Sequence, residues 1–322
     1  MEARTTEWST TKFGAFTEQI EAHIYHIRRL TITTKGEQLT TFGQVRSAAP
    51  YLELLSIGDR DFPESISQLR IPDDLFGGIT PKLTHLRLYK CGISEESPLF
   101  KGLRCLELYS VPPREHVPIY HWLAALMQMP QLEKLVLHDG NSSDSVEVSH
   151  RLMFTVDLLS LTELSILASV SGCTVVLAHL VLPTLTRLCV NAQINPQVFS
   201  PAEYLIQCVT KNTHGPQEAE ALQSLFIRDN KKRANIVAWA MPGQDSDDGF
   251  RSPVNLSPVR LEFSIQSLYS EFRTNIPLYN AMLAALPLNS TASLTVEGSP
   301  PLSKENWRSH ASRWHKLERV RL

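Results

Sequence analysis

The chain has 322 residues, of which 43% are hydrophobic and 20% charged, and its formal net charge is -2. This composition is typical of a folded protein and excludes an intrinsically disordered chain. The near-neutral charge also excludes a global basic field that would draw the chain to nucleic acid or to an anionic membrane.

Residues 1–26 lack the apolar core of a secretory signal peptide, and we interpret them as an N-terminal cap or remnant. The longest apolar stretch, residues 173–182, is about half the length needed to cross a bilayer and predicts a buried helix or strand instead. The five cysteines are scattered without any C-x-x-C pair. They indicate reduced thiols in a cytoplasmic or nuclear protein.

From residue 27 onward, the pattern apolar-x-x-apolar-x-apolar recurs to the end of the chain. Strict copies begin at Ile27, Leu52, Leu83, Leu103, Leu132, Leu161, Leu185 and Leu222, and looser copies begin at Leu256, Thr291 and Leu317. The distance between starts ranges from 20 residues (83 to 103) to 37 residues (185 to 222). The shorter spacings are typical of a leucine-rich repeat, and the longer ones indicate longer helices or inserted loops.

Proline strengthens the repeat, because it stands two places before the first apolar residue at Pro50, Pro81, Pro130 and Pro183. Only 20 of the 322 residues are proline, so this recurrence indicates a shared structural unit. Proline cannot continue a preceding helix, and it starts an extended segment whose alternate side chains point inward. Each copy therefore predicts a buried strand.

Helical patterns lie between the strands, at residues 117–130, 200–209, 275–287 and 303–317. Apolar residues recur at helical spacing in each of them. Ser200 and Glu203 form a predicted capping box at the start of the second helix. The predicted apolar faces are Ile119, Trp122, Leu123, Leu126 and Met127, then Tyr204, Leu205, Cys208 and Val209, then Leu278, Met282 and Leu286, and finally Trp307, Ala311 and Trp314.

Strand and helix in alternation predict an α/β fold, a leucine-rich-repeat solenoid or horseshoe. We expect a parallel sheet on its concave side, helices on its convex side and irregular repeat lengths. Residues 241–258 are polar and read as an inserted loop, and residues 138–150 are a second candidate loop. Because the repeat resumes after both, we predict a single domain over residues 1–322.

The stretches at residues 71–113, 123–140, 182–190 and 286–322 resemble the leucine-rich-repeat region of fungal F-box proteins. The resemblance runs from about Tyr51 to the end of the chain. It implies that the repeats recognise a substrate, while an F-box helix bundle binds the adaptor subunit of a cullin-RING ubiquitin ligase. The phrase L-P-x-E-[IL]-L that usually opens an F-box is not found in the first fifty residues. The chain reads as a truncated gene product, a fragment or a family member that lost the box.

The sequence offers little for the alternative of a catalytic or metal-binding protein. The chain contains no G-x-S-x-G, Walker A loop, Rossmann glycine pattern or H-E-x-x-H. His23 and His26 have helical spacing, but no carboxylate or thiol accompanies them, so we read them as structural or solvent-facing. The acidic run at 245–248 lacks the later Glu of a calcium loop and reads as a solvated loop. We expect no catalytic residue, no metal and no cofactor, and a hydrolase reading finds no support.

A basic stretch with tryptophans near the C-terminus raises the alternative of RNA binding by stacking. Its basic residues are Lys304, Arg308, Arg313, Lys316, Arg319 and Arg321. The tryptophans fall at core spacing, so we read the segment as the polar outer face of a terminal repeat, with no nucleic-acid partner.

The candidate binding surface follows from strand alternation, because residues between the leucines face the concave side. The predicted contact residues are His85, Arg87, Tyr89, Glu107, Tyr109, Lys134, His138, Arg187, Asn191, Phe226 and Arg228. Tyrosine and arginine are typical of interface hot spots. In the alternative interpretation, Arg87 and Glu107 are merely paired with each other on an ordinary sheet surface.

The residues together predict a non-catalytic protein-interaction module in the cytoplasm, the nucleus or both. The resemblance to F-box proteins implies a protein substrate on the concave face and, if an F-box exists upstream, the adaptor of a cullin-RING ligase as partners. A scaffold or inhibitor with no link to ubiquitin is the alternative. We expect no membrane partner.

Overall fold

The computed structural model describes residues 2–4, 10–59, 70–109, 120–138, 154–182, 187–194, 202–213, 224–230, 233–239, 259–267, 276–286, 291–297 and 302–321. The chain divides into two compact units. Unit 1 comprises Met1–Ser142 and Phe154–Leu161, and unit 2 comprises Ser143–Met153 and Thr162–Leu322. One continuous solenoid over residues 1–322 therefore stays a prediction.

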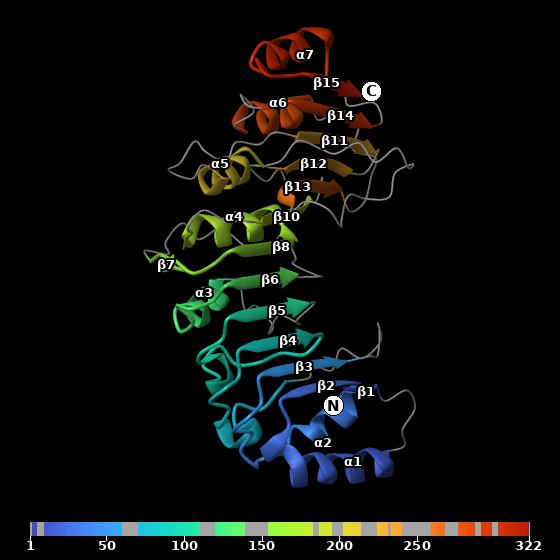
Figure 1. Cartoon of the computed structure of the whole chain (residues 1–322), viewed down its shortest axis with the longest axis vertical. Coiled ribbons are helices and arrows are strands. Elements are labelled where there is room, and N and C mark those ends of the chain that lie inside the picture. The colour runs from blue at the N-terminus through green and yellow to red at the C-terminus, as the bar shows by residue number, and fades with distance from the viewer. Residues whose placement is uncertain are drawn as a thin grey trace. The chain divides into compact units, whose positions relative to one another are not determined.

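Strands β1 to β6 of unit 1 form a parallel sheet in which each strand pairs with the next along the chain (Figure 1). They are β1 (Glu2–Arg4), β2 (Arg29–Thr34), β3 (Leu54–Asp59), β4 (His85–Tyr89), β5 (Cys105–Tyr109) and β6 (Lys134–His138). The prediction of an α/β fold with a parallel sheet is confirmed for this unit.

The repeated apolar residues form the core of unit 1. The leucines and isoleucines at alternate positions of β2 to β6 are buried, as in β4, where Leu86 and Leu88 have 1% and 0% of their surface exposed. The register places Leu86 beside Leu106 and Leu106 beside Leu135, without a shift along β4, β5 and β6. Because side chains alternate in a strand, the same register aligns the residues on the opposite side of the sheet.

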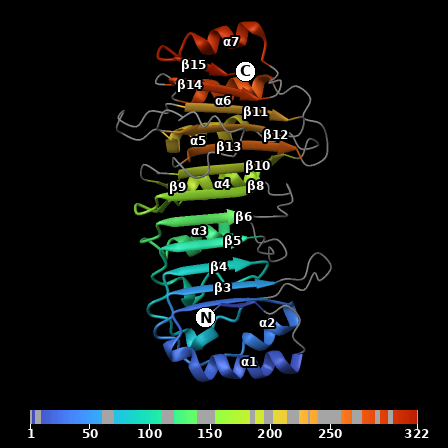
Figure 2. The same ribbon diagram turned by 45° about the vertical axis from the view of Figure 1, so that its right-hand side comes forward.

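The helical segments of unit 1 are α1 (Thr10–His23), η1 (Ile24–His26), α2 (Gly36–Phe42), η2 (Leu75–Gly78), η3 (Pro98–Phe100) and α3 (Tyr120–Leu126), and Val156–Asp157 forms β7. In Figure 2, α3 lies behind β5 and β6. Its predicted apolar residues Leu123 and Leu126 are buried, whereas Met127 is 58% exposed. The inclusion of Met127 in the apolar face was wrong: the helix ends at Leu126, and of the two methionines that follow it, Met129 is buried and Met127 is not.

The sheet of unit 2 is mixed. Its strands are β8 (Glu163–Ser169), β10 (Arg187–Ile194), β11 (Ser224–Asn230), β12 (Arg233–Trp239), β13 (Val259–Ser267), β14 (Ser293–Glu297) and β15 (Arg319–Arg321). The spatial order is β8, β10, β13, β12, β11, β14, β15, and β12 is antiparallel to both of its neighbours.

The expectation of an entirely parallel sheet is therefore wrong in the middle of unit 2. Only two residues separate β11 from β12 in the sequence, and so short a connection cannot carry the chain back to start a parallel strand. The repeat pattern did not predict strand β12. Its inward residues include Ile236 and the small Ala238, both fully buried, instead of leucines.

The helices of unit 2 are α4 (Val170–His179), α5 (Ala202–Thr213), α6 (Ile276–Ala285) and α7 (Lys304–Ala311), and β9 is Leu180–Val181. Helix α4 occupies most of the apolar stretch predicted to be buried, and Ser169 caps it by accepting a hydrogen bond from Gly172 N at 3.1 Å. Leu205, Cys208 and Val209 of α5 are buried, but Tyr204 is 43% exposed and its predicted burial was wrong. The predicted cap Ser200 and the predicted loop at 241–258 lie outside the described residues.

Helix α7 begins after Ser303, whose hydroxyl accepts a hydrogen bond from Asn306 N at 3.1 Å. Trp314 is buried as predicted and lies 6.2 Å from Trp307 between ring centroids. Ala311 is exposed, which corrects its predicted place on the apolar face. Among the helices that the structure describes, none has both the length and the apolar character needed to cross a membrane.

Candidate functional site

The candidate surface is the side of the unit 1 sheet that faces away from the buried leucines. We restrict it to β2 to β6 and call it the outward face. It consists of Arg29, Thr31, Thr33, Leu54, Ser56, Gly58, His85, Arg87, Tyr89, Cys105, Glu107, Tyr109, Lys134, Val136 and His138. The register pairs Glu2 and Arg4 of β1 with Thr31 and Thr33 at its edge. The pairing register aligns the residues of the outward face in three rows across β2 to β6, since each strand contributes one residue to each row. Seven of the eleven predicted contact residues lie here, on β4, β5 and β6.

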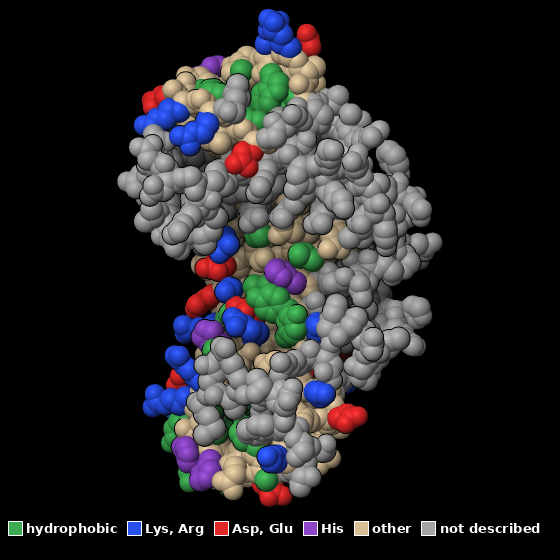
Figure 3. All heavy atoms as spheres, turned by 90° about the vertical axis from the view of Figure 1, so that its right-hand side faces the viewer, with side chains coloured by type: hydrophobic (Ala, Val, Ile, Leu, Met, Phe, Trp, Pro, Cys, Tyr) green, Lys and Arg blue, Asp and Glu red, His purple; other side chains and the backbone are tan. Residues whose placement is uncertain are grey.

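An aromatic row crosses the C-terminal ends of β4, β5 and β6. Tyr89 and Tyr109 are aligned, with ring centroids 6.3 Å apart, and Tyr109 meets His138 edge-on at 5.0 Å. Tyr89 is 43% exposed, while Tyr109 and His138 are half-buried. The view in Figure 3 shows hydrophobic side chains next to histidine and to Lys or Arg side chains. Such a row offers rigid aromatic surface to a partner at small entropic cost.

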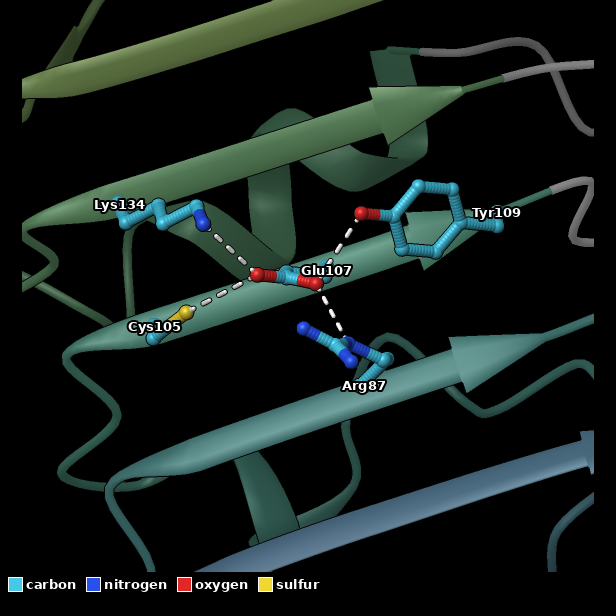
Figure 4. Close-up of polar contacts among 5 residues, drawn as sticks. All are labelled: Arg87, Cys105, Glu107, Tyr109 and Lys134. Atoms are coloured by element: carbon cyan, nitrogen blue, oxygen red, sulfur yellow. Dashed lines mark hydrogen bonds and ion pairs between the residues drawn. The ribbon is translucent and has the colours of Figure 1, made fainter. Parts of the chain in front are cut away.

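A charged cluster centres on Glu107, in the row beside the aromatic residues (Figure 4). Arg87 Nε donates to Glu107 Oε2 at 2.6 Å, and Lys134 Nζ lies 3.0 Å from Oε1. The hydroxyl of Tyr109 donates to Oε2 at 3.1 Å, and Cys105 Sγ lies 3.8 Å from Oε1. Residues from three neighbouring strands therefore converge on one carboxylate.

Glu107 is buried, with 3% of its surface exposed, whereas the side chains of Arg87 and Lys134 are 56% and 40% exposed. Glu107 was predicted as a contact residue, but its neighbours cover it. The pairing of Arg87 with Glu107, raised as an alternative, is present, and Lys134 joins it. We infer that Glu107 holds the two cations and Tyr109 in place, and that these neighbours form the accessible surface.

The pKa of Glu107 reflects two opposing effects, burial and hydrogen bonding. Burial alone would raise its pKa, but the hydrogen bonds from Arg87 and Lys134 outweigh burial and lower the pKa to about 2. Burial, together with the charge of Glu107, raises the pKa of Tyr109, and burial lowers the pKa of His138. At neutral pH Glu107 is thus a carboxylate between two cations, while Tyr109 and the neighbouring His138 are neutral.

The thiols of unit 1 are poorly suited to nucleophilic chemistry. Burial raises the pKa of Cys105 to about 11, and Glu107 adds to this effect. Burial raises the pKa of Cys91 to about 12, and its Sγ points to Ile57 O at 3.6 Å. A reactive cysteine needs the opposite, a lowered pKa and access to solvent.

We therefore expect Cys91 in the native chain to react with iodoacetamide at pH 8 roughly a thousandfold more slowly than in urea, since only the thiolate reacts and its pKa rises from 9.0 to about 12. Mass spectrometry of alkylated peptides measures both rates. Half-buried Cys105 serves as the internal comparison and should react faster than Cys91. Rapid alkylation of Cys91 in the folded protein would contradict its placement.

The other four predicted contact residues lie in unit 2. Arg187 is exposed at the start of β10. Asn191 is half-buried, its Nδ2 donates to Cys189 Sγ at 3.2 Å, and its Oδ1 accepts a hydrogen bond from buried Ser264, a partner that sequence reasoning missed. Phe226 and Arg228 belong to β11, but their side chains lie outside the described part of the structure.

The two histidines considered as metal ligands, His23 and His26, have ring centroids 5.4 Å apart. Within the described residues, no three His, Cys, Asp or Glu side chains gather in a way that could hold a metal ion. The acidic run at 245–248 lies outside those residues. No protein-family model matches the chain, and no curated protein matches its sequence.

Proposed function

We propose that the chain is a non-catalytic protein-interaction module, a leucine-rich-repeat solenoid whose outward face binds a partner protein. The observation that carries this proposal is the row Tyr89, Tyr109 and His138 beside the cations held on Glu107. Aromatic and arginine side chains dominate interface hot spots, and here they sit on a rigid sheet with its register in place. We further propose that the module works in the cytoplasm or the nucleus.

The Tyr89→Ala/Tyr109→Ala variant tests this surface. We expect capture of the module's binding partners to fall by about tenfold or more, because hot-spot aromatics typically contribute a factor of that size or larger. Affinity capture with quantitative mass spectrometry compares the variant with the parent chain. The fold should persist, since both side chains are outside the core.

Tyr25→Ala/Tyr51→Ala is a matched control, because these tyrosines of unit 1 are 58% and 47% exposed but lie off the outward face. Their loss should leave capture within twofold of the parent. Equal capture by the folded face variant and the parent would refute the assignment of this surface.

Substrate recognition for a cullin-RING ubiquitin ligase is the more specific proposal, supported by the resemblance to fungal F-box proteins described above. A scaffold or inhibitor unrelated to ubiquitin would use the same face. Co-purification of the ligase adaptor with the natural full-length protein favours the first role. Partner binding without any adaptor favours the second.

A further inference from the structure

The outward face carries an uneven set of charges. Its cationic residues are Arg29, Arg87 and Lys134, all from different strands. Among the fifteen residues of β2 to β6 that define the face, the one carboxylate is Glu107, which is buried beneath Arg87 and Lys134. Among the fifteen positions of this face, every exposed charge is therefore positive.

Pairs of opposite charge lie just outside the face and cancel one another. Arg104 Nη1 is 3.3 Å from Glu133 Oε1, and Arg28 Nη1 is 4.0 Å from Glu53 Oε1, with all four side chains well exposed. These two pairs therefore add no net charge next to the outward face. Complementary charge steers a partner to a surface and selects against partners of like charge.

Arg87 has the geometry of an anion-binding residue. Its Nε donates to Glu107, and its two terminal nitrogens donate no hydrogen bond to the residues that the structure describes. Its side chain is 56% exposed. A guanidinium anchored at Nε presents a planar pair of donors, which matches the two oxygens of a carboxylate.

An apolar site lies at a defined spacing from Arg87. Tyr89 follows Arg87 by two residues on the same side of β4, and Tyr109 and His138 continue its row. Two residues along a strand span about 6.6 Å, which is also the spacing of alternate side chains in an extended peptide. One extended segment can therefore place an anionic side chain at Arg87 and an apolar side chain on the aromatic row.

We propose that the outward face binds an acidic, extended peptide segment of its partner. In this segment a carboxylate pairs with Arg87, with Lys134 close by, and an aromatic or large apolar side chain two positions away packs on Tyr89, Tyr109 and His138. This inference rests on the proposed function and names the chemistry of its partner.

The test uses the full chain and labelled 12-residue peptides in which a charged position and a Trp recur two residues apart. Three matched peptides carry Glu, Gln or Lys at the charged positions. We expect the Glu peptide to bind about tenfold more tightly than the Gln peptide, and the Lys peptide to bind least. Fluorescence anisotropy at low and high salt should show weaker binding of the Glu peptide at high salt.

Arg87→Met should weaken binding of the Glu peptide by about tenfold, and Arg104→Met should change it less than twofold. Arg104 is a matched control, since its side chain is also 56% exposed and also paired with a glutamate. Arg87→Lys keeps the charge beside Glu107 and loses the planar donor pair, so it should fold and still weaken binding several-fold.

Several outcomes overturn the inference. If the Gln peptide binds as well as the Glu peptide and Tyr89→Ala/Tyr109→Ala abolishes both, the acidic preference is wrong while the interaction surface stands. If that tyrosine variant binds like the parent, the proposed surface fails as well. The inference is also overturned if Arg87→Met and Arg104→Met weaken binding of the Glu peptide equally, or if no peptide binds. It is likewise overturned if a 12-nucleotide single-stranded RNA binds more tightly than the Glu peptide.

Discussion

Replacing Arg87 and Lys134 together by methionine is expected to lower the free energy of unfolding of unit 1 by about 3 kcal/mol at pH 7. The variant keeps Glu107 buried and removes both cations that bind its carboxylate. An uncompensated buried charge typically costs 3–5 kcal/mol, and we expect the lower end because both cations are partly exposed and screened by water.

The loss of stability in the double variant should depend on pH. In the parent chain the pKa of Glu107 is lowered from 4.5 to about 2, so its stabilisation is complete above about pH 4.5 and is lost as pH falls towards 2. In the double variant the pKa of Glu107 should rise instead, which adds a penalty at neutral pH that disappears on acidification. The difference in stability should therefore shrink steadily from pH 7 to pH 3.

Urea denaturation followed by hydrogen exchange in β4, β5 and β6 measures this difference and separates unit 1 from unit 2. Arg104→Met removes an exposed ion pair and should cost less than about 1 kcal/mol. Adding Glu107→Gln to the double variant should recover stability, because no charge is then left unpaired. A double variant as stable as the parent at pH 7 would show that the cations do not compensate Glu107.

Leu106→Ala is expected to lower the free energy of unfolding by about 2–5 kcal/mol, the usual range for a leucine deleted from a packed core. Leu106 is fully buried in β5, between Leu86 and Leu135 of the neighbouring strands. The resulting cavity lies under the centre of the outward face. Peptide binding should then weaken only where the fold is lost, as the face residues are unchanged.

Leu159→Ala removes the same atoms from a leucine of unit 1 that is 68% exposed, and should change stability by less than about 0.5 kcal/mol. Chemical denaturation of both variants, monitored by hydrogen exchange in β5, compares them directly. Similar losses in the two variants would contradict the placement of Leu106 in the core.

The strands were largely predictable because one local pattern determines each of them. In all eight strict copies of the repeat, the strand begins two residues after the first apolar position, as at Leu83 and His85 or Leu222 and Ser224. Strand order in unit 2 was not predictable, since a repeat pattern gives no information on which neighbour a strand pairs with. Because β11 and β12 form a hairpin that pairs through β12 with β13, the strands there lie in the order β13, β12, β11, the reverse of their order in the sequence.

The outward residues of unit 1 were predictable from alternation alone, and the register brings together the seven on β4, β5 and β6. The burial of Glu107 could not be predicted from alternation, because it depends on side chains from both neighbouring strands that cover the carboxylate. Alternation places Glu107 and Arg87 on one side of the sheet but does not show which of them water reaches. Whether the face binds a partner stays a prediction.

The strand order of unit 2 has a consequence for how the protein folds. In unit 1 each new strand can add to the one before it, so native pairing can follow the order of synthesis. In unit 2, β10 pairs with β13, and β11 and β12 lie beyond β13. The hairpin can therefore form early but cannot join β10 until β13 has been made, and such non-local closure slows folding. Until then β10 exposes an unpaired edge to other chains, which makes this step the expected point of misassembly and of dependence on chaperones.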